Sequence, residues 1–139
     1  MKQKKAHGLC NLKKIHGEGN HLIIDGYSEA DLNDAAFIER FMLDLVAKIK
    51  MTPISKALII DYKSKCKDYL QDGITGTIIL AESNITIHTY PQYKFFCLDL
   101  FSCNEFPLEK TIKFIKQRLK LKSYKKQLLK RGFYDKIKI

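Results

Sequence analysis

Apolar residues recur at helical spacing in two segments of the chain. The first segment starts at a residue that can cap a helix, Asn33 or Asp34, and runs to about Lys50, ahead of Pro53. The second starts at Pro107 and also carries its apolar residues on one side. We therefore expect two amphipathic helices, each with one face against a hydrophobic core.

The other hydrophobic segments are short, and they have the alternation or the compact apolar run that is typical of β-strands. A turn is expected at Gly17–Asn20, and the strand Ala57–Tyr62 is expected to be buried. The predicted strands are Leu9–Ile15, His21–Tyr27, Ala57–Tyr62, Thr77–Glu82, Ile85–Tyr90 and Phe95–Ser102. Two helices on one face of such a sheet predict an α+β fold, a two-layer sandwich with a mainly antiparallel sheet.

The composition indicates a single domain over residues 1–139. Apolar residues make up 45% of the chain, and no linker rich in Gly, Ser or Pro divides it. The apolar runs are too short to span a membrane, and the basic N-terminus lacks the apolar segment of a signal peptide. The four cysteines are expected to be reduced thiols of a cytoplasmic protein, and their spacing predicts no metal site.

Positive charge is concentrated at the C-terminal end. The formal net charge is +10; residues 110–139 contain twelve Lys and Arg and one acid, and the other residues thirteen basic and fourteen acidic. The body is therefore close to neutral, and the charge belongs to a basic C-terminal extension from about residue 120. Such a segment could contact nucleic acid, but a solvated lysine-rich surface is the favoured interpretation.

The segment from Gly73 to Cys103 places several reactive side chains at short spacing. Ser83 follows Glu82, His88 comes five residues after Ser83, and Cys103 comes twenty residues after it. Each residue alone is more often structural than catalytic. Together they resemble the self-cleavage and active-site segment of the short prokaryotic S-adenosylmethionine decarboxylase proenzymes. The resemblance extends more weakly over Gly17 to about Lys120 and leaves the basic end outside.

This resemblance implies a precursor that makes its own cofactor. The Ser83 hydroxyl would attack the carbonyl carbon of Glu82, and loss of the Ser83 α-proton would then cut the chain and leave a covalent pyruvoyl group in place of the serine. By resemblance, His88 is the base, and Thr75 is the hydroxyl that assists processing. The pyruvoyl group would form a Schiff base with the substrate, and Cys103 would donate the final proton.

The substrate positions of the family are matched less closely. Tyr69 and Tyr90 stand where the family stacks aromatic rings on its substrate. Gln92 replaces a glutamate that binds ribose hydroxyls, and Asn84 replaces a histidine. The resemblance implies decarboxylation of S-adenosylmethionine for spermidine synthesis. An arginine or ornithine decarboxylase of the same family and a non-processing binding homologue are the alternatives.

The resemblance also implies how the processed protein is organised. Self-cleavage would give a β chain of residues 1–82 and an α chain of residues 83–139. The processed protomers would form a homodimer, with active sites built across the interface. No partner other than this second copy and the small-molecule substrate is expected.

Overall fold

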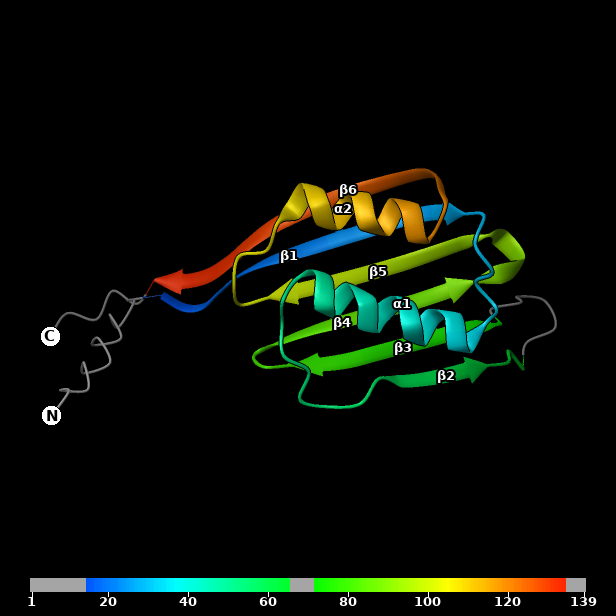
Figure 1. The fold of residues 1–139 in the computed structure, drawn as a ribbon, viewed down its shortest axis with the longest axis horizontal. Helices are drawn as coiled ribbons and strands as arrows, with labels where there is room; N and C mark the ends of the chain where they lie inside the picture. The colour runs from blue at the N-terminus through cyan, green and yellow to red at the C-terminus, as the bar shows by residue number, and fades with distance from the viewer. Residues whose placement is uncertain (1–14, 66–71, 135–139) are drawn as a thin grey trace, which may run out of the picture.

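One antiparallel sheet and two helices form the two layers of the protein (Figure 1). The computed structural model describes residues 15–65 and 72–134. The sheet has six strands in the order β2-β3-β4-β5-β1-β6. In chain order the elements are β1 (Ile15–Ser28), α1 (Ala35–Lys48), β2 (Leu58–Tyr62), β3 (Gly73–Leu80), β4 (Ser83–Tyr90), the 3-10 helix η1 (Pro91–Tyr93), β5 (Phe95–Ser102), α2 (Leu108–Arg118) and β6 (Leu121–Tyr134). The predicted two-layer α+β sandwich is confirmed.

The core lies between the helices and one face of the sheet. Every second residue of β4 and β5 is buried, as expected for strands with one face against a core. Phe41 of α1 and Ile115 of α2 are fully buried against that face. Figure 1 shows both helices on the same side of the sheet. We call the opposite side, on which the described residues place no helix, the uncovered face.

Both helices begin where the sequence predicts. The Asp34 side chain caps α1, because its Oδ1 accepts a hydrogen bond of 3.0 Å from the backbone N–H of Phe37. Helix α2 follows Pro107, whose fixed φ suits a helix start. Within the residues that the structure describes, no helix is long and apolar enough to cross a membrane.

The strands agree with the prediction in number more than in detail. β5 has the predicted bounds, whereas β3 and β4 each begin earlier, and Glu82 lies in the turn between them rather than in a strand. β2 was expected to be buried, but it is an edge strand with mostly exposed side chains. Of the predicted strand Leu9–Ile15, only Ile15 lies within the described residues.

The predicted turn at Gly17–Asn20 is wrong, because these residues lie inside β1. The pairing of β1 with β6 shifts register between His16 and Gly19, which is the irregularity that the glycines accommodate. A Cβ atom on Gly19 would lie 2.4 Å from the backbone oxygen of Ser102, so a side chain cannot fit there. Glycine at position 19 therefore allows β1 to lie close to β5 and does not form a turn.

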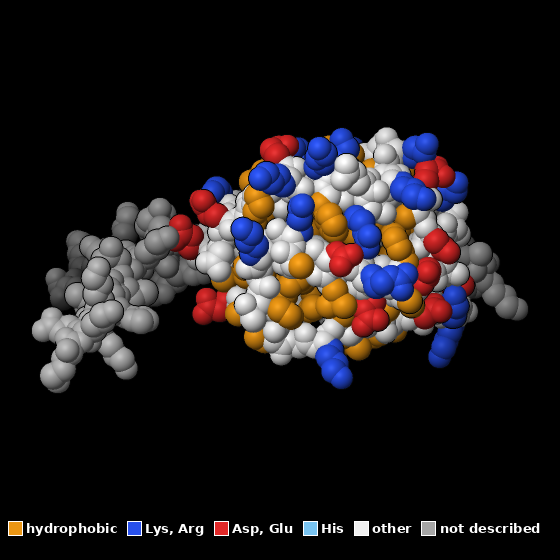
Figure 2. Space-filling view, in the orientation of Figure 1, with side chains coloured by type: hydrophobic (Ala, Val, Ile, Leu, Met, Phe, Trp, Pro, Cys, Tyr) orange, Lys and Arg blue, Asp and Glu red, His pale blue; other side chains and the backbone are white. Residues whose placement is uncertain are grey.

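The largest difference between the predicted and the observed structure concerns the basic C-terminal end of the chain. It was expected to be an extension, but residues 121–134 form β6, which pairs with β1 and completes the sheet. Tyr124 packs against the core, while most other side chains of β6 are exposed. Figure 2 shows Lys and Arg side chains along this edge of the molecule, at the top of the view. Lysines on an edge strand discourage pairing with another sheet.

Candidate active site

Ser83 and Cys103 meet where β4 begins and β5 ends. Ser83 is 5% exposed, and its Oγ accepts a hydrogen bond of 2.9 Å from the backbone N–H of Cys103. The same Oγ lies 3.4 Å from the Cys103 Sγ. The two residues are far apart in sequence, but the antiparallel pairing of β4 with β5 places them side by side. The structure thus brings together the predicted nucleophile and the predicted proton donor.

A tight turn precedes Ser83. Leu80 and Ser83 are paired, so only Ala81 and Glu82 connect β3 to β4. Glu82 has a φ of 60°, in the left-handed region, which costs a residue other than glycine roughly 1 kcal/mol or more. The Cys103 Sγ also lies 3.6 Å from the Ala81 carbonyl oxygen. The peptide bond between Glu82 and Ser83 therefore follows a strained and exposed residue.

Ser102 fixes the backbone that carries the Cys103 N–H. Its buried Oγ donates a hydrogen bond of 2.6 Å to the Asn104 carbonyl oxygen and lies 3.2 Å from the Asn104 nitrogen. This local turn directs the N–H of Cys103 toward Ser83. Ser102 is a functional residue that the sequence pattern alone does not single out, although Ser and Asn at a strand end are typical turn residues.

Thr75 and His88 form a second pair, on β3 and β4. They are opposite each other in the sheet, and the Thr75 Oγ1 lies 3.0 Å from the His88 Nδ1. Depending on the imidazole tautomer, the hydroxyl donates or accepts this hydrogen bond. Tyr62 and Tyr90 help these two residues to line a cavity of about 130 Å³. The pair therefore presents an oriented imidazole at an open cavity.

Within one chain the two pairs do not meet. Ser83 and His88 are five residues apart on β4, which corresponds to roughly 17 Å along an extended strand. An odd separation also places the two side chains on opposite faces of the sheet: Ser83 is buried toward the helices, and His88 lies on the uncovered face. A single chain therefore does not place the predicted base within reach of the predicted cleavage site.

The predicted substrate residues lie near Thr75 and His88. Tyr90 lines the same cavity as His88, and its ring lies 6.0 Å from that of Phe95. Gln92 lines a neighbouring cavity of about 210 Å³, together with Lys63 and Asp72 among others. Tyr69 lies outside the described residues.

A row of polar side chains crosses the uncovered face through His88. Cys97 of β5 is opposite both His88 of β4 and Asp25 of β1. Burial and the neighbouring Asp25 carboxylate raise the pKa of Cys97 from 9.0 to about 11. The sequence pattern does not single out Asp25 or Cys97, because only the strand register places them beside His88.

Comparison with known proteins identifies the family. Residues 20–132, which include most of β6, match the family model described as S-adenosylmethionine decarboxylase. The chain is 29% identical over 117 residues to the S-adenosylmethionine decarboxylase proenzyme of Archaeoglobus fulgidus, covering 82% of this chain and 97% of that protein. The proenzyme of Thermotoga petrophila is 31% identical over 125 residues, with coverages of 87% and 89%.

A solved structure agrees with these sequence relatives. The crystal structure of the adenosylmethionine decarboxylase from Aquifex aeolicus superposes with a TM-score of 0.68 at 27% identity, covering 86% of this chain and 94% of that one. The likeness thus extends over the whole sandwich, sheet and helices together. The chain belongs to the S-adenosylmethionine decarboxylase family, whose members are carboxy-lyases.

Proposed function

We propose that this chain is a proenzyme that cuts itself between Glu82 and Ser83 and then decarboxylates S-adenosylmethionine. The contact of Ser83 with Cys103, directly after the strained Glu82, is the observation that carries the proposal. The names of the relatives support the same substrate and do not favour arginine, ornithine or a binding protein without activity.

The cleavage step starts at Ser83. Its Oγ attacks the carbonyl carbon of Glu82, the C–N bond breaks, and the hydroxyl proton passes to the Ser83 nitrogen, which gives an ester. A base then removes the Ser83 α-proton, and the Glu82 carboxylate leaves. Hydrolysis of the new N-terminus releases ammonia. The Cys103 N–H holds the Ser83 Oγ at 2.9 Å, and cleavage releases the strain at Glu82.

The residues around position 83 fit a pyruvoyl group. When present, this group supplies a ketone that condenses with the amine of the substrate and accepts electrons as carbon dioxide leaves. The Cys103 Sγ lies 3.4 Å from the Ser83 Oγ. That oxygen would leave with Glu82, and the ketone would form on the adjacent Cα as the nitrogen is lost, so a thiol proton is held beside the reacting position. Cys103 is therefore the proposed proton donor.

A second copy of the chain is proposed to complete the site. Leu58, Ile60 and Ile79 lie on the uncovered face and are 57%, 48% and 53% exposed, an apolar strip beside Thr75 and His88. Two such faces can pack as aligned sheets about 10 Å apart. A two-fold axis that pairs opposite ends of the strands would bring the Thr75–His88 pair of one copy over the start of β4 in the other. The base would then approach the Ser83 backbone, whose α-proton it removes, from the face opposite to the buried side chain.

The same arrangement assigns the substrate residues. Tyr90 and Gln92 lie beside His88, so they would enter the completed site with it. The Tyr90 ring would stack on the sulfonium or the adenine, and the Gln92 amide would hydrogen-bond a ribose hydroxyl. The product would supply aminopropyl groups for spermidine synthesis in the cytoplasm.

Intact mass measured under denaturing conditions tests the cleavage. We expect two chains divided between Glu82 and Ser83, the second blocked at its N-terminus, and no division in Ser83→Ala. A single uncut chain of 16.2 kDa after long incubation would refute the proposal. Release of carbon dioxide from S-adenosylmethionine, but not from arginine or ornithine, then tests the substrate.

A further inference from the structure

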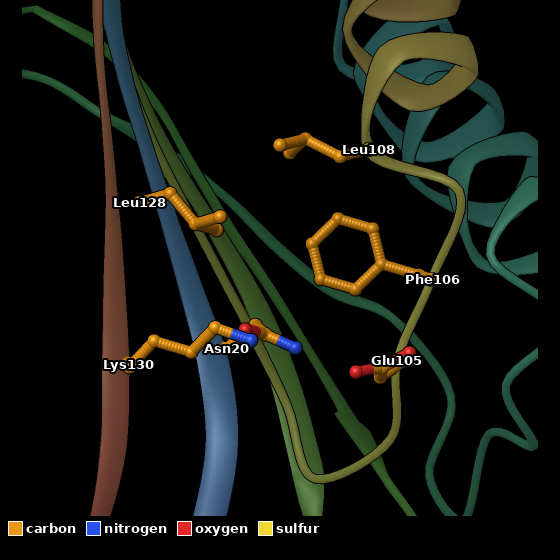
Figure 3. Close-up of a pocket in the computed structure, with 6 residues that line it drawn as sticks. All are labelled: Asn20, Glu105, Phe106, Leu108, Leu128 and Lys130. Carbon is orange, nitrogen blue, oxygen red and sulfur yellow. The ribbon is translucent and has the colours of Figure 1, made fainter.

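A cavity of about 180 Å³ lies on the helix side of the sheet, away from the Thr75–His88 pair (Figure 3). It opens between β1, β6 and the loop that joins β5 to α2. Six residues line it: Asn20, Glu105, Phe106, Leu108, Leu128 and Lys130. Glu105 is two residues from Cys103, so the cavity adjoins the loop of the proposed active site without sharing the residues of that site.

Two opposite charges face this cavity without ion-pair partners. Among the described residues neither Glu105 nor Lys130 takes part in an ion pair, although other charged groups on α2 and β6 do. Figure 3 shows Lys130 reaching in from β6 and Glu105 from the loop, with Asn20 between them. The cavity thus offers one cationic and one anionic contact.

Asn20 adds an unsatisfied acceptor. Its Oδ1 is buried and has no hydrogen-bond partner in the part of the chain that the structure describes. Buried polar atoms in native proteins are nearly always paired with protein, water or ligand. Asn20 lines the cavity, so a rotation of its side-chain amide would present this acceptor to a donor that enters.

The remaining wall of the cavity is apolar. Phe106 of the loop and Leu108 at the start of α2 point toward Leu128 of β6. The volume is below the range of about 300–1,000 Å³ that is typical of sites for drug-sized ligands. The cavity therefore suits a small molecule with an apolar stem and two charged groups.

We propose that this cavity binds a free α-amino acid with an apolar side chain. The ammonium group would contact Glu105 and donate to the Asn20 Oδ1, the carboxylate would contact Lys130, and the side chain would lie on Phe106, Leu108 and Leu128. A simple amine would be repelled by the Lys130 ammonium, and a simple carboxylate would be repelled by the Glu105 carboxylate. Only a zwitterion satisfies both ends.

Isothermal titration calorimetry on the full-length chain tests the site, with L-leucine and L-methionine as probes. Two analogues serve as matched ligands: 4-methylpentanoate, which lacks the amine of leucine, and 3-methylbutylamine, which lacks its carboxylate. We expect saturable binding of the amino acids and at least tenfold weaker binding of both analogues. The titration is run on the purified chain and on Ser83→Ala, because binding does not require self-cleavage.

Variants locate the binding. Glu105→Gln and Lys130→Gln are each expected to weaken L-leucine binding by about tenfold or more. The control variants Glu109→Gln and Lys122→Gln change the same residue types outside the cavity. They are expected to leave the affinity for L-leucine unchanged. Absence of saturable binding up to about 10 mM ligand would overturn the proposal. The proposal would also be overturned if 3-methylbutylamine bound as tightly as L-leucine, or if neither Glu105→Gln nor Lys130→Gln changed the affinity for L-leucine.

Discussion

The separation of Ser83 from His88 leads to a sharp prediction about two inactive variants. The side chains are roughly 17 Å apart along β4 and lie on opposite faces, whereas proton transfer needs a contact of about 3 Å. If a second copy supplies His88, neither Ser83→Ala nor His88→Ala is cut when purified alone. Mixed dimers of the two variants should nevertheless be cut, because one of their two sites is complete.

The expected extent follows from the pairing of subunits. Random 1:1 mixing makes about half of the His88→Ala chains partners of Ser83→Ala chains, since a two-fold dimer holds one copy of each or two of the same. About half of the His88→Ala chains should therefore be cut, and none of the Ser83→Ala chains.

The two variants are co-refolded or co-expressed, and the products are separated by intact mass under denaturing conditions. The substitution at His88 lies in the fragment that starts at residue 83, so the mass identifies which chain was cut. Each variant refolded alone is the control. Mixed dimers in which both chains stay whole would refute the reasoning, and so would cleavage of His88→Ala on its own.

Three further predictions concern other parts of the structure. Cys103→Ala keeps the backbone N–H at Ser83, so mass analysis should still find cleavage, while carbon dioxide assays should show decarboxylation slowed about a hundredfold. A chain that ends at Lys120 lacks β6, and its circular dichroism should show loss of the fold. The unfolded chain should lose the Cys97 proton near pH 9.0 and the folded chain only near 11, so melting temperatures should fall across that interval, less so in Cys97→Ala.

The fold was predictable where the signal is local. The alternation along Phe95–Ser102 and the cap at Asp34 both correspond to observed elements. β6 was not predictable in this way, because its lysines obscure any apolar alternation and its pairing partner, β1, lies about a hundred residues earlier. β2 has the composition of a buried strand, yet it is an edge strand that pairs only with β3. Its Leu58 and Ile60 side chains lie exposed on the uncovered face.

Within the candidate site, the sequence predicts the contact between Ser83 and Cys103 but not the position of His88. The spacing of Ser83 and Cys103 fits two antiparallel strands, and the structure does bring them together. The spacing of Ser83 and His88 suggests proximity, but the side chains of one strand alternate between faces, so a separation of five places them apart. The neighbours Cys97 and Asp25 emerge only from the register of three strands.

The strand order has a consequence for the cut protein. Cleavage before Ser83 would leave β1, β2 and β3 in one chain and β4, β5 and β6 in the other. In the sheet, β1 lies between β5 and β6, so three of the five strand junctions would join different chains. The two chains would thus be interleaved and could not separate without disruption of the sheet. Refolding after cleavage would need an encounter between two molecules, so thermal stability would depend on their concentration. Self-cleavage would therefore make the fold difficult to regain once it is lost.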